Sequence, residues 1–193
     1  MIGVSNNTVT VGTLYTGEPP ALTVEPSGPA EDITHARSRV FDTLTRGQMS
    51  CSAYPPGIFT HRWFVVRPED VQEMTYSSIE AWKSAEEDTA MRIVGFWRAR
   101  DLGADGEATI LMIVYYPDLA AWDASRFWKP VPKGGSQPHR QVWGELFRKR
   151  REITLNSWVT VHRLGQAALP GPVMNQGGAR RPAPKIAGDP GHE

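Results

Sequence analysis

Two histidines and an arginine are the residues of this sequence best suited to moving a proton. His61 and Arg62 are adjacent in FTHRWFVVRP (59–68), and His162 lies near the end of EITLNSWVTVHRL (152–164). A neutral imidazole can take or give a proton near pH 7, and a guanidinium can hold an oxyanion or a ligand carbonyl through its donors. Acid–base chemistry is therefore the first hypothesis, with His61 ahead of His162 as the base.

The strand pattern of residues 58–66 separates His61 from Arg62, because neighbours on a strand point to opposite faces. One face receives Phe59, His61, Trp63 and Val65, and the other receives Thr60, Arg62, Phe64 and Val66. His61 is expected to be either a catalytic base or a core histidine with one hydrogen bond. Arg62 is expected either to orient a ligand or to form a structural ion pair with Glu69, Glu107 or Glu145.

Polar and aromatic side chains also alternate in the last predicted strand and at the ends of two others. In residues 152–164, one face carries Asn156, Trp158, Thr160 and His162. This row is either a pocket wall with an aromatic floor or an outward row with Trp158 at a dimer seam. Tyr115 and Tyr116 point to opposite faces, so one phenol could donate to an oxyanion at the cavity mouth. With Asn156, the tryptophans Trp63, Trp97 and Trp158 are the candidate substrate-binding residues.

The elements that position these residues follow a β-α-β-β-α-β order. Strands are predicted at 58–66, 91–99, 108–116 and 152–164, and an Asp-Gly turn joins the middle pair. Helices are predicted from Pro68 to about 85, from Pro117 and Asp118 onward, and over 139–151 with Val142, Trp143 and Leu146 facing inward. The order predicts an α+β, ferredoxin-like split β-α-β fold with a four-stranded antiparallel sheet.

Helices on one face of such a sheet leave the other face open, and an apolar open face is usually covered by a second copy. A homodimer is therefore expected. The preceding residues, 1–57, are predicted to form an extension with a hairpin (8–15 and 21–25) and a helix with Ile33, Ala36, Val40 and Leu44 on one stripe. The Gly/Pro-rich tail, 165–193, cannot bury enough apolar surface to fold alone.

Composition excludes several classes of function. Lys plus Arg and Asp plus Glu both number 21, a balance that argues against a nucleic-acid binder. The one basic run, Arg148–Arg151, is expected at a helix end facing solvent. Cys51 is the only cysteine, and the five histidines lack metal-ligand spacing, so neither a disulfide nor a metal site is predicted. No signal peptide or membrane span is evident, which favours a cytoplasmic protein.

The motifs of residues 58–164 resemble the NIPSNAP group of dimeric α/β-barrel proteins. The shared features are an Arg, an aromatic residue and Arg-Pro in the first strand (Arg62, Phe64, Arg67 and Pro68), Gly95-Phe96-Trp97 in the second strand, and Tyr116-Pro117-Asp118-Leu119 after the third. The His and Trp usual in the third strand of that family are absent, and Met112 and Val114 lie near those positions. The resemblance implies a dimeric α/β barrel, a superfamily that includes cofactor-free oxygenases, isomerases, dehydratases, lyases and haem enzymes.

The leading hypothesis is a small cofactor-independent enzyme that binds a flat, apolar carbonyl or hydroxyl compound between sheet and helices. It would act as a lyase, dehydratase, cyclase or isomerase, with His61 or His162 as base and Arg62, Tyr115 or Asn156 stabilising the oxyanion. One alternative is a cofactor-free or haem-dependent oxygenase, with haem held by His61, His139 or His162. The other is a non-enzymatic ligand-binding or interaction module.

Overall fold

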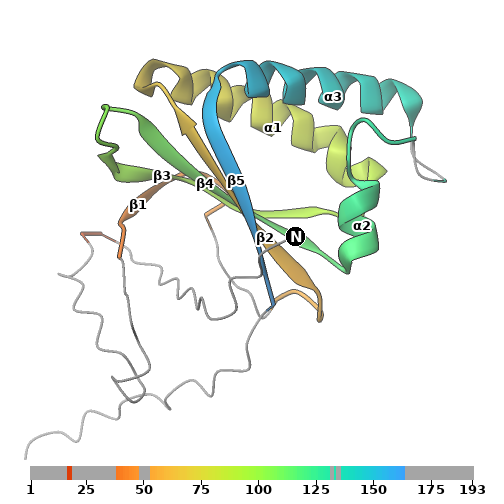
Figure 1. Cartoon of the computed structure of the whole chain (residues 1–193). Helices are drawn as coiled ribbons and strands as arrows, with labels where there is room; N and C mark the ends of the chain where they lie inside the picture. The colour runs from red at the N-terminus through yellow and green to blue at the C-terminus, as the bar shows by residue number, and fades with distance from the viewer. Residues whose placement is uncertain (1–16, 19–37, 48–52, 131–132, 134–135, 164–193) are drawn as a thin grey trace, which may run out of the picture.

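The chain forms a twisted, five-stranded antiparallel sheet with its long helices on one face (Figure 1). The computed structural model describes residues 17–18, 38–47, 53–130, 133 and 136–163. The strand order is β1-β3-β4-β2-β5. The strands are β1 (Phe41–Thr45), β2 (Ile58–Val66), β3 (Arg92–Leu102), β4 (Ala108–Tyr116) and β5 (Thr154–His162).

The helices confirm the predicted ferredoxin-like order. A 3₁₀ turn (Pro68–Asp70) leads into α1 (Val71–Asp88) after β2, and α2 (Leu119–Ala124) and α3 (Gln137–Glu152) lie between β4 and β5. Asp118 caps α2 by accepting a hydrogen bond from the backbone N–H of Ala121, as expected of a helix that begins there. The segment from β2 to β5 is thus β-α-β-β-α-β, and β1 adds a fifth strand to the predicted four.

The helix predicted over residues 33–44 is wrong where the structure describes it. Residues 41–45 form β1, which pairs antiparallel with β3, so that Phe41 lies opposite Ala99. Leu44 packs against the helix-side core and Phe41 against the opposite face, as alternation in a strand requires. The helical spacing of the apolar residues was a local signal, and the tertiary pairing of β1 with β3 overrode it. The predicted hairpin and tail lie outside the described residues.

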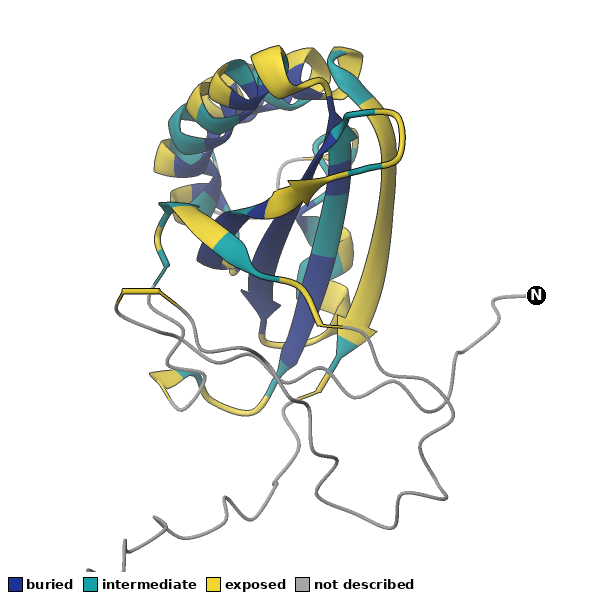
Figure 2. Cartoon of the chain, turned by 90° about the vertical axis from the view of Figure 1, so that its left-hand side faces the viewer, coloured by how far each residue is buried: buried dark blue, intermediate teal, exposed yellow. Residues whose placement is uncertain are grey.

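Each face of the sheet has its own apolar cluster. On the helix side, residues such as Phe64, Phe96 and Tyr116 pack under α1 and α3 together with Trp82 and Trp143. The opposite face carries a smaller buried cluster of Phe59, Val94, Trp97, Leu111, Ile113 and Tyr115. Edge strand β5 is exposed along most of its length beside the buried central strands (Figure 2). The open face is therefore apolar at its centre and accessible at the β5 edge.

The phase of α3 differs from the prediction at two positions. Trp143 is buried as expected, but Val142 is 56% exposed and does not face inward. The basic run lies in the last turn of α3 as predicted, yet Arg150 is only 7% exposed rather than solvated. Arg150 lies seven residues after Trp143, so both point toward the sheet. Among the described residues, no helix is long and apolar enough to cross a bilayer.

Candidate functional site

His61 and His162 meet on the face of the sheet that the helices leave open. β2 pairs with β5 so that His61 lies opposite Thr160 and Phe59 lies opposite His162. The diagonal neighbours His61 and His162 stack, with ring centroids 4.0 Å apart and planes inclined by 26°. His162 Nε2 lies 2.8 Å from Thr160 Oγ1, which orients that ring. The two residues that the sequence predicted as alternative bases therefore form one pair.

Burial keeps this pair neutral at pH 7. Burial, and to a smaller extent the positive charge that His162 can carry, lower the pKa of His61 from 6.5 to about 4. Burial also lowers the pKa of His162. Within the described part of the chain, the ring nitrogens of His61 form no hydrogen bond, so its lone pair is available to a ligand. A neutral imidazole with a free lone pair can accept a proton from a substrate.

Aromatic rings extend from the histidine pair in both directions along the sheet. Beyond His61 along β2, the rings of Trp63 and Trp158 stack almost parallel, with centroids 5.7 Å apart and planes inclined by 9°. The ring centroid of Phe41, on β1, lies 6.0 Å from that of Trp63. Trp158 is 44% exposed, so this stack reaches the surface at the β5 edge. Parallel indoles offer a flat apolar ligand a surface on which to stack.

At the other end of the histidine pair, Phe59 and Tyr115 form the apolar boundary. Their ring centroids are 5.4 Å apart, and Tyr54 packs against both rings. Tyr115 is buried and faces the same side as His61, as the sequence predicted for one of the two tyrosines. A phenol placed there can donate a hydrogen bond to an oxyanion formed near the pair.

Trp97 also lies on the open face, where it depends on a glycine. A methyl group added at Gly95 would lie 2.1 Å from the indole of Trp97 and 2.6 Å from the backbone oxygen of Arg46. Only glycine lets the indole lie across β3 at this point. Trp97 therefore belongs to the same surface as His61, although it lies two strands away.

These side chains form a histidine–aromatic face that consists of Phe59, His61, Trp63, Trp97, Tyr115, Trp158 and His162. Asn156 lies on the same side but is exposed near the start of β5, opposite Val65. The face points away from α1 and α3, so the expectation of a site between sheet and helices is wrong for these residues. Alternation placed them on a common side, but only the pairing register placed them next to one another.

Arg62 lies on the other side of the sheet, apart from the histidine pair. Its Nη2 donates to Tyr116 Oη at 2.9 Å, and its Nε donates to Thr60 Oγ1 at 3.4 Å. The predicted ion pairs with Glu69, Glu107 or Glu145 do not form among the described residues. Arg62 and an oxyanion at His61 would be on opposite faces, so of the proposed stabilising groups only Tyr115 and Asn156 share a face with the base.

Sequence reasoning missed three residues that belong to these groups. Phe59 could have been found from the same alternation that selected His61. Arg150 could have been found from its seven-residue spacing to Trp143 on the same helix. Nothing local in the sequence indicated that Tyr54 packs against Tyr115.

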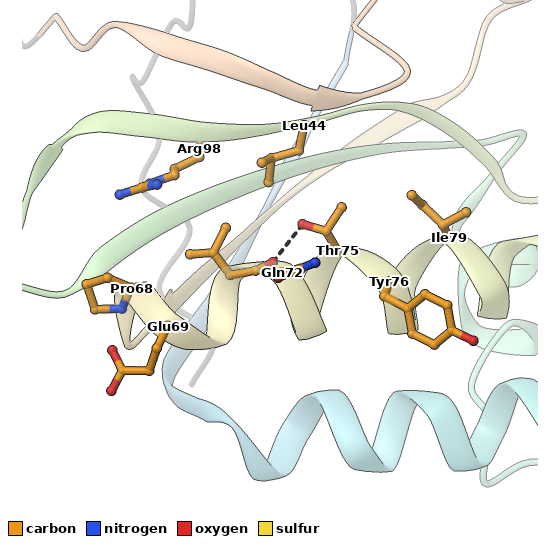
Figure 3. Close-up of a pocket in the computed structure, with 9 residues that line it drawn as sticks. Leu44, Pro68, Glu69, Gln72, Thr75, Tyr76, Ile79 and Arg98 are labelled. Atoms are coloured by element: carbon orange, nitrogen blue, oxygen red, sulfur yellow. Dashed lines mark hydrogen bonds between the residues drawn. The ribbon is translucent and has the colours of Figure 1, made fainter.

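A separate open groove of about 660 Å³ lies between α1 and the edge formed by β1 and β3 (Figure 3). It is lined by Leu44, Pro68, Glu69, Val71, Gln72, Thr75, Tyr76, Ile79 and Arg98. Glu69 and Arg98 are the charged residues of this lining, and no histidine is among the lining residues. None of the predicted site residues borders it. The described residues also contain no group of three His, Cys, Asp or Glu side chains placed to hold a metal ion.

The lowered pKa of His61 predicts a specific loss of stability in acid. The unfolded chain binds a proton at His61 near pH 6.5, whereas the folded chain does so only near pH 4. Stability should therefore fall as the pH drops from about 6.5 to about 4, and His61 should contribute no pH dependence above that window. Urea denaturation midpoints measured between pH 7 and pH 4 should decrease less in His61→Gln than in the unmodified protein.

His139→Gln is the matched control, since that imidazole is half exposed beside Asp88 and belongs to a different region. Its midpoints should still decrease in acid more than those of His61→Gln, because His61 is intact. An equal acid loss in His61→Gln and the unmodified protein would mean that His61 titrates normally in the folded state.

Comparisons with known proteins identify no family. No family model and no curated protein matches the sequence. Solved structures with a similar arrangement include a "putative antibiotic biosynthesis monooxygenase" from Caulobacter crescentus CB15, with 11% identity over 60% of this chain and 96% of that chain and a TM-score of 0.38. A conserved protein from Methanosarcina mazei Go1 shows 15% identity over 57% of this chain and 94% of that chain, with a TM-score of 0.36.

A third similar structure is a "putative monooxygenase" from Lactobacillus acidophilus NCFM. It shows 11% identity over 56% of this chain and a TM-score of 0.34, and the match spans 44% of that longer chain. At these identities and scores, none of the three assigns an activity, and the resemblance to the NIPSNAP group stays a prediction. The strand order of this chain is itself that of an α+β ferredoxin-like fold, with β1 as an added edge strand.

Proposed function

We propose that this protein is a small enzyme that binds flat apolar compounds with a carbonyl or hydroxyl group on the histidine–aromatic face and moves a proton with His61. The observation that carries this proposal is the stacked pair of His61 and His162, held neutral by burial and flanked by aromatic rings. The ring of the ligand would stack on Trp63 and Trp158, which places its polar group near the imidazoles.

The proposed chemistry uses groups of the chain alone. His61 would accept a proton from a carbon next to the carbonyl, and Tyr115 would donate a hydrogen bond to the enolate oxygen that forms. Return of the proton to another atom gives isomerisation, and loss of a leaving group gives dehydration or lysis. A neutral imidazole in an apolar site is a suitable base, because desolvation removes competing water.

Binding can be tested before the natural substrate is known. Titration with 2-acetylnaphthalene, a flat ketone, should quench tryptophan fluorescence saturably, because the ligand stacks on the indoles of Trp63 and Trp158. Trp158→Ala should weaken this quenching, whereas Trp128→Ala, which removes a 62% exposed indole after α2, should not. Equal binding by both variants would place the ligand elsewhere.

An oxygenase that uses the same base is the second candidate. A histidine that deprotonates a phenol would give an anion able to react with O₂ directly, and the apolar surroundings of His61 suit that step equally well. Oxygen uptake with 1-naphthol would favour this activity, and a Soret absorption band on the purified protein would favour its haem-dependent form. Saturable binding with neither hydrogen exchange nor oxygen uptake would favour a non-enzymatic binding module.

We also propose that a second copy of the chain covers the histidine–aromatic face. An exposed indole at an unpaired edge strand is a surface that a homodimer would bury and that water would otherwise reach. Light scattering at micromolar concentration should give twice the monomer mass, and Trp158→Glu should shift the protein toward the monomer. Trp128→Glu should leave the mass unchanged. A stable monomer in the unmodified protein would contradict the proposal.

A further inference from the structure

Arg62 and Arg150 lie on the helix side of the sheet, and among the described residues neither forms an ion pair with a carboxylate. Arg150, in the last turn of α3, is 7% exposed. Its Nη1 donates to Ser78 Oγ at 3.2 Å, and its guanidinium lies 4.9 Å from the ring centre of Phe64 and 4.6 Å from that of Phe147. These contacts hold the cation in place, but none of them neutralises its charge.

Arg62 lies on the same face of β2 as Phe64, the residue two positions later whose ring the Arg150 guanidinium contacts. Its Nη2 donates to the hydroxyl of Tyr116, which is 1% exposed, and this hydroxyl acts as an acceptor in the bond. The hydroxyl proton of Tyr116 has no acceptor among the described residues. Tyr116 and the two arginines therefore supply several unused donors on the helix side of the sheet.

The positive charge of this region is not compensated by a carboxylate of the described residues. Burial and the charge of Arg62 lower the pKa of Arg150 to about 9, with Tyr116 acting in the opposite direction. The guanidinium of Arg150 is still cationic at pH 7. Within the described residues, no carboxylate forms an ion pair with either one. Glu73 on α1 accepts from Lys149 Nζ at 2.6 Å and from Ser77 Oγ at 3.0 Å, so its carboxylate is already engaged.

A buried cation without a partner is costly, and removing one of two partners generally destabilises a protein strongly. Proteins that keep such a cation commonly use it to hold an anion, since guanidiniums bind carboxylate and phosphate oxygens in pairs. Arg150 is such a buried cation, and the phenol of Tyr116 adds a further donor. Arg62 is only half-buried, so a ligand can reach the site from its side.

The approach at Arg62 is bordered by exposed apolar side chains of β5. Val159 lies opposite Arg62 in the strand pairing, and Val161 lies opposite Thr60, so both valines share the helix-side face with Arg62. They are 44% and 45% exposed. A ligand whose charged end reaches the guanidiniums would therefore lay an apolar body along this edge.

We infer that Arg62, Arg150 and Tyr116 form a binding site for the oxyanion head of a small amphiphile, a carboxylate or a phosphate monoester, with its apolar chain along Val159 and Val161. The site is on the opposite side of the sheet from the histidine–aromatic face. It does not depend on the function proposed for that face.

The test measures the melting temperature of the full chain with three octyl compounds below their micelle-forming concentrations. Octanoate carries a carboxylate, octyl phosphate carries a phosphoryl group, and 1-octanol carries the same chain without charge. At least one anion should raise the melting temperature saturably, with 1-octanol having a much smaller effect. The anion that binds more tightly identifies the head group.

Three variants and one control assign the binding to this site. Arg62→Met and Tyr116→Phe should each weaken binding of the preferred anion roughly tenfold or more, because each removes a hydrogen bond to a charged group. Arg98→Met is the control, since Arg98 lies on the helix side of β3 at the separate groove and should not affect binding. Arg150→Met should abolish binding while leaving the ligand-free protein as stable or more stable, because it replaces an unpaired buried cation with an apolar chain of similar length.

The inference is wrong if neither anion stabilises the unmodified protein or if 1-octanol stabilises it equally. It is also wrong if Arg62→Met binds the anion as tightly as the unmodified protein. Circular dichroism of each variant separates lost binding from lost folding, and a variant that does not fold is replaced in the comparison by Arg62→Lys, which retains the charge but not the paired donors.

Discussion

Replacing His61 with glutamine should lower the rate of hydrogen–deuterium exchange at the methyl group of 2-acetylnaphthalene by roughly 10²–10⁴-fold, the usual contribution of a general base. In D₂O, His61 would remove a methyl proton to give the enolate, and a deuteron would return to the same carbon. NMR of the ketone measures this exchange without knowledge of the natural substrate. Glutamine keeps a polar group of similar reach but cannot take up the proton.

Three controls separate base catalysis from a structural effect. His162→Gln should reduce the rate less than His61→Gln, because His162 is more exposed and is engaged by Thr160. His139→Gln should leave the rate unchanged. The fluorescence-detected affinity for the ketone should be similar in His61→Gln and in the unmodified protein, which would assign the loss to the chemical step.

The pH profile gives an independent readout of the same role. Exchange by the unmodified protein should rise as the pH increases through the lowered pKa of His61, about 4, and should then level off. An unchanged rate and pH profile in His61→Gln would eliminate histidine base catalysis. Tyr115 and Asn156 would then be the residues to test, as groups that polarise a bound carbonyl.

The strands that carry the site were predictable from sequence, because their local patterns were strong. The predicted bounds 58–66 and 108–116 are those observed for β2 and β4. The Asp-Gly turn between β3 and β4 was predictable as well, and Gly106 adopts a φ of 81° there, which side chains disfavour. Alternation then placed His61 and Trp63 on one face of their strand and Tyr115 and Tyr116 on opposite faces of theirs before any tertiary contact was known.

The contacts between strands were not predictable from the same patterns. The stacking of His61 on His162 depends on the register between β2 and β5, which places Phe59 opposite His162 across about one hundred residues of sequence. A shift of one residue would move every side chain of β5 to the other face and leave Val161 beside the base. For the same reason, sequence could list Arg62 and Arg150 but not show that Arg150 is buried on the same side of the sheet as Arg62.

Helical phase marks another limit. Val142 and Trp143 are both apolar and adjacent in sequence, and the sequence predicted that both would face the sheet. Neighbours on a helix are about 100° apart, so a helix packed through one stripe buries one of them more than the other. Trp143 is fully buried, and Val142 points outward.

Trp143→Ala should therefore lower the free energy of unfolding by about 3–5 kcal/mol, the usual cost of removing a large aromatic side chain from a core. The indole packs edge-on against Phe147 at 5.3 Å, and the guanidinium of Arg140 lies 4.9 Å from its centre. Its Nε1 donates to Asp88 Oδ2 at 3.0 Å, which links α3 to the end of α1. Truncation leaves a cavity and a buried carboxylate oxygen without this donor.

Val142→Ala, one residue earlier, is the matched control and should change the free energy by about 0.5 kcal/mol or less, because the site is largely exposed. Trp143→Phe should fall between the two, at about 1–3 kcal/mol, since it keeps most of the packing but removes the hydrogen bond to Asp88. Urea denaturation followed by circular dichroism measures all three. If Val142→Ala costs as much as Trp143→Ala, the helix is rotated so that both face the sheet.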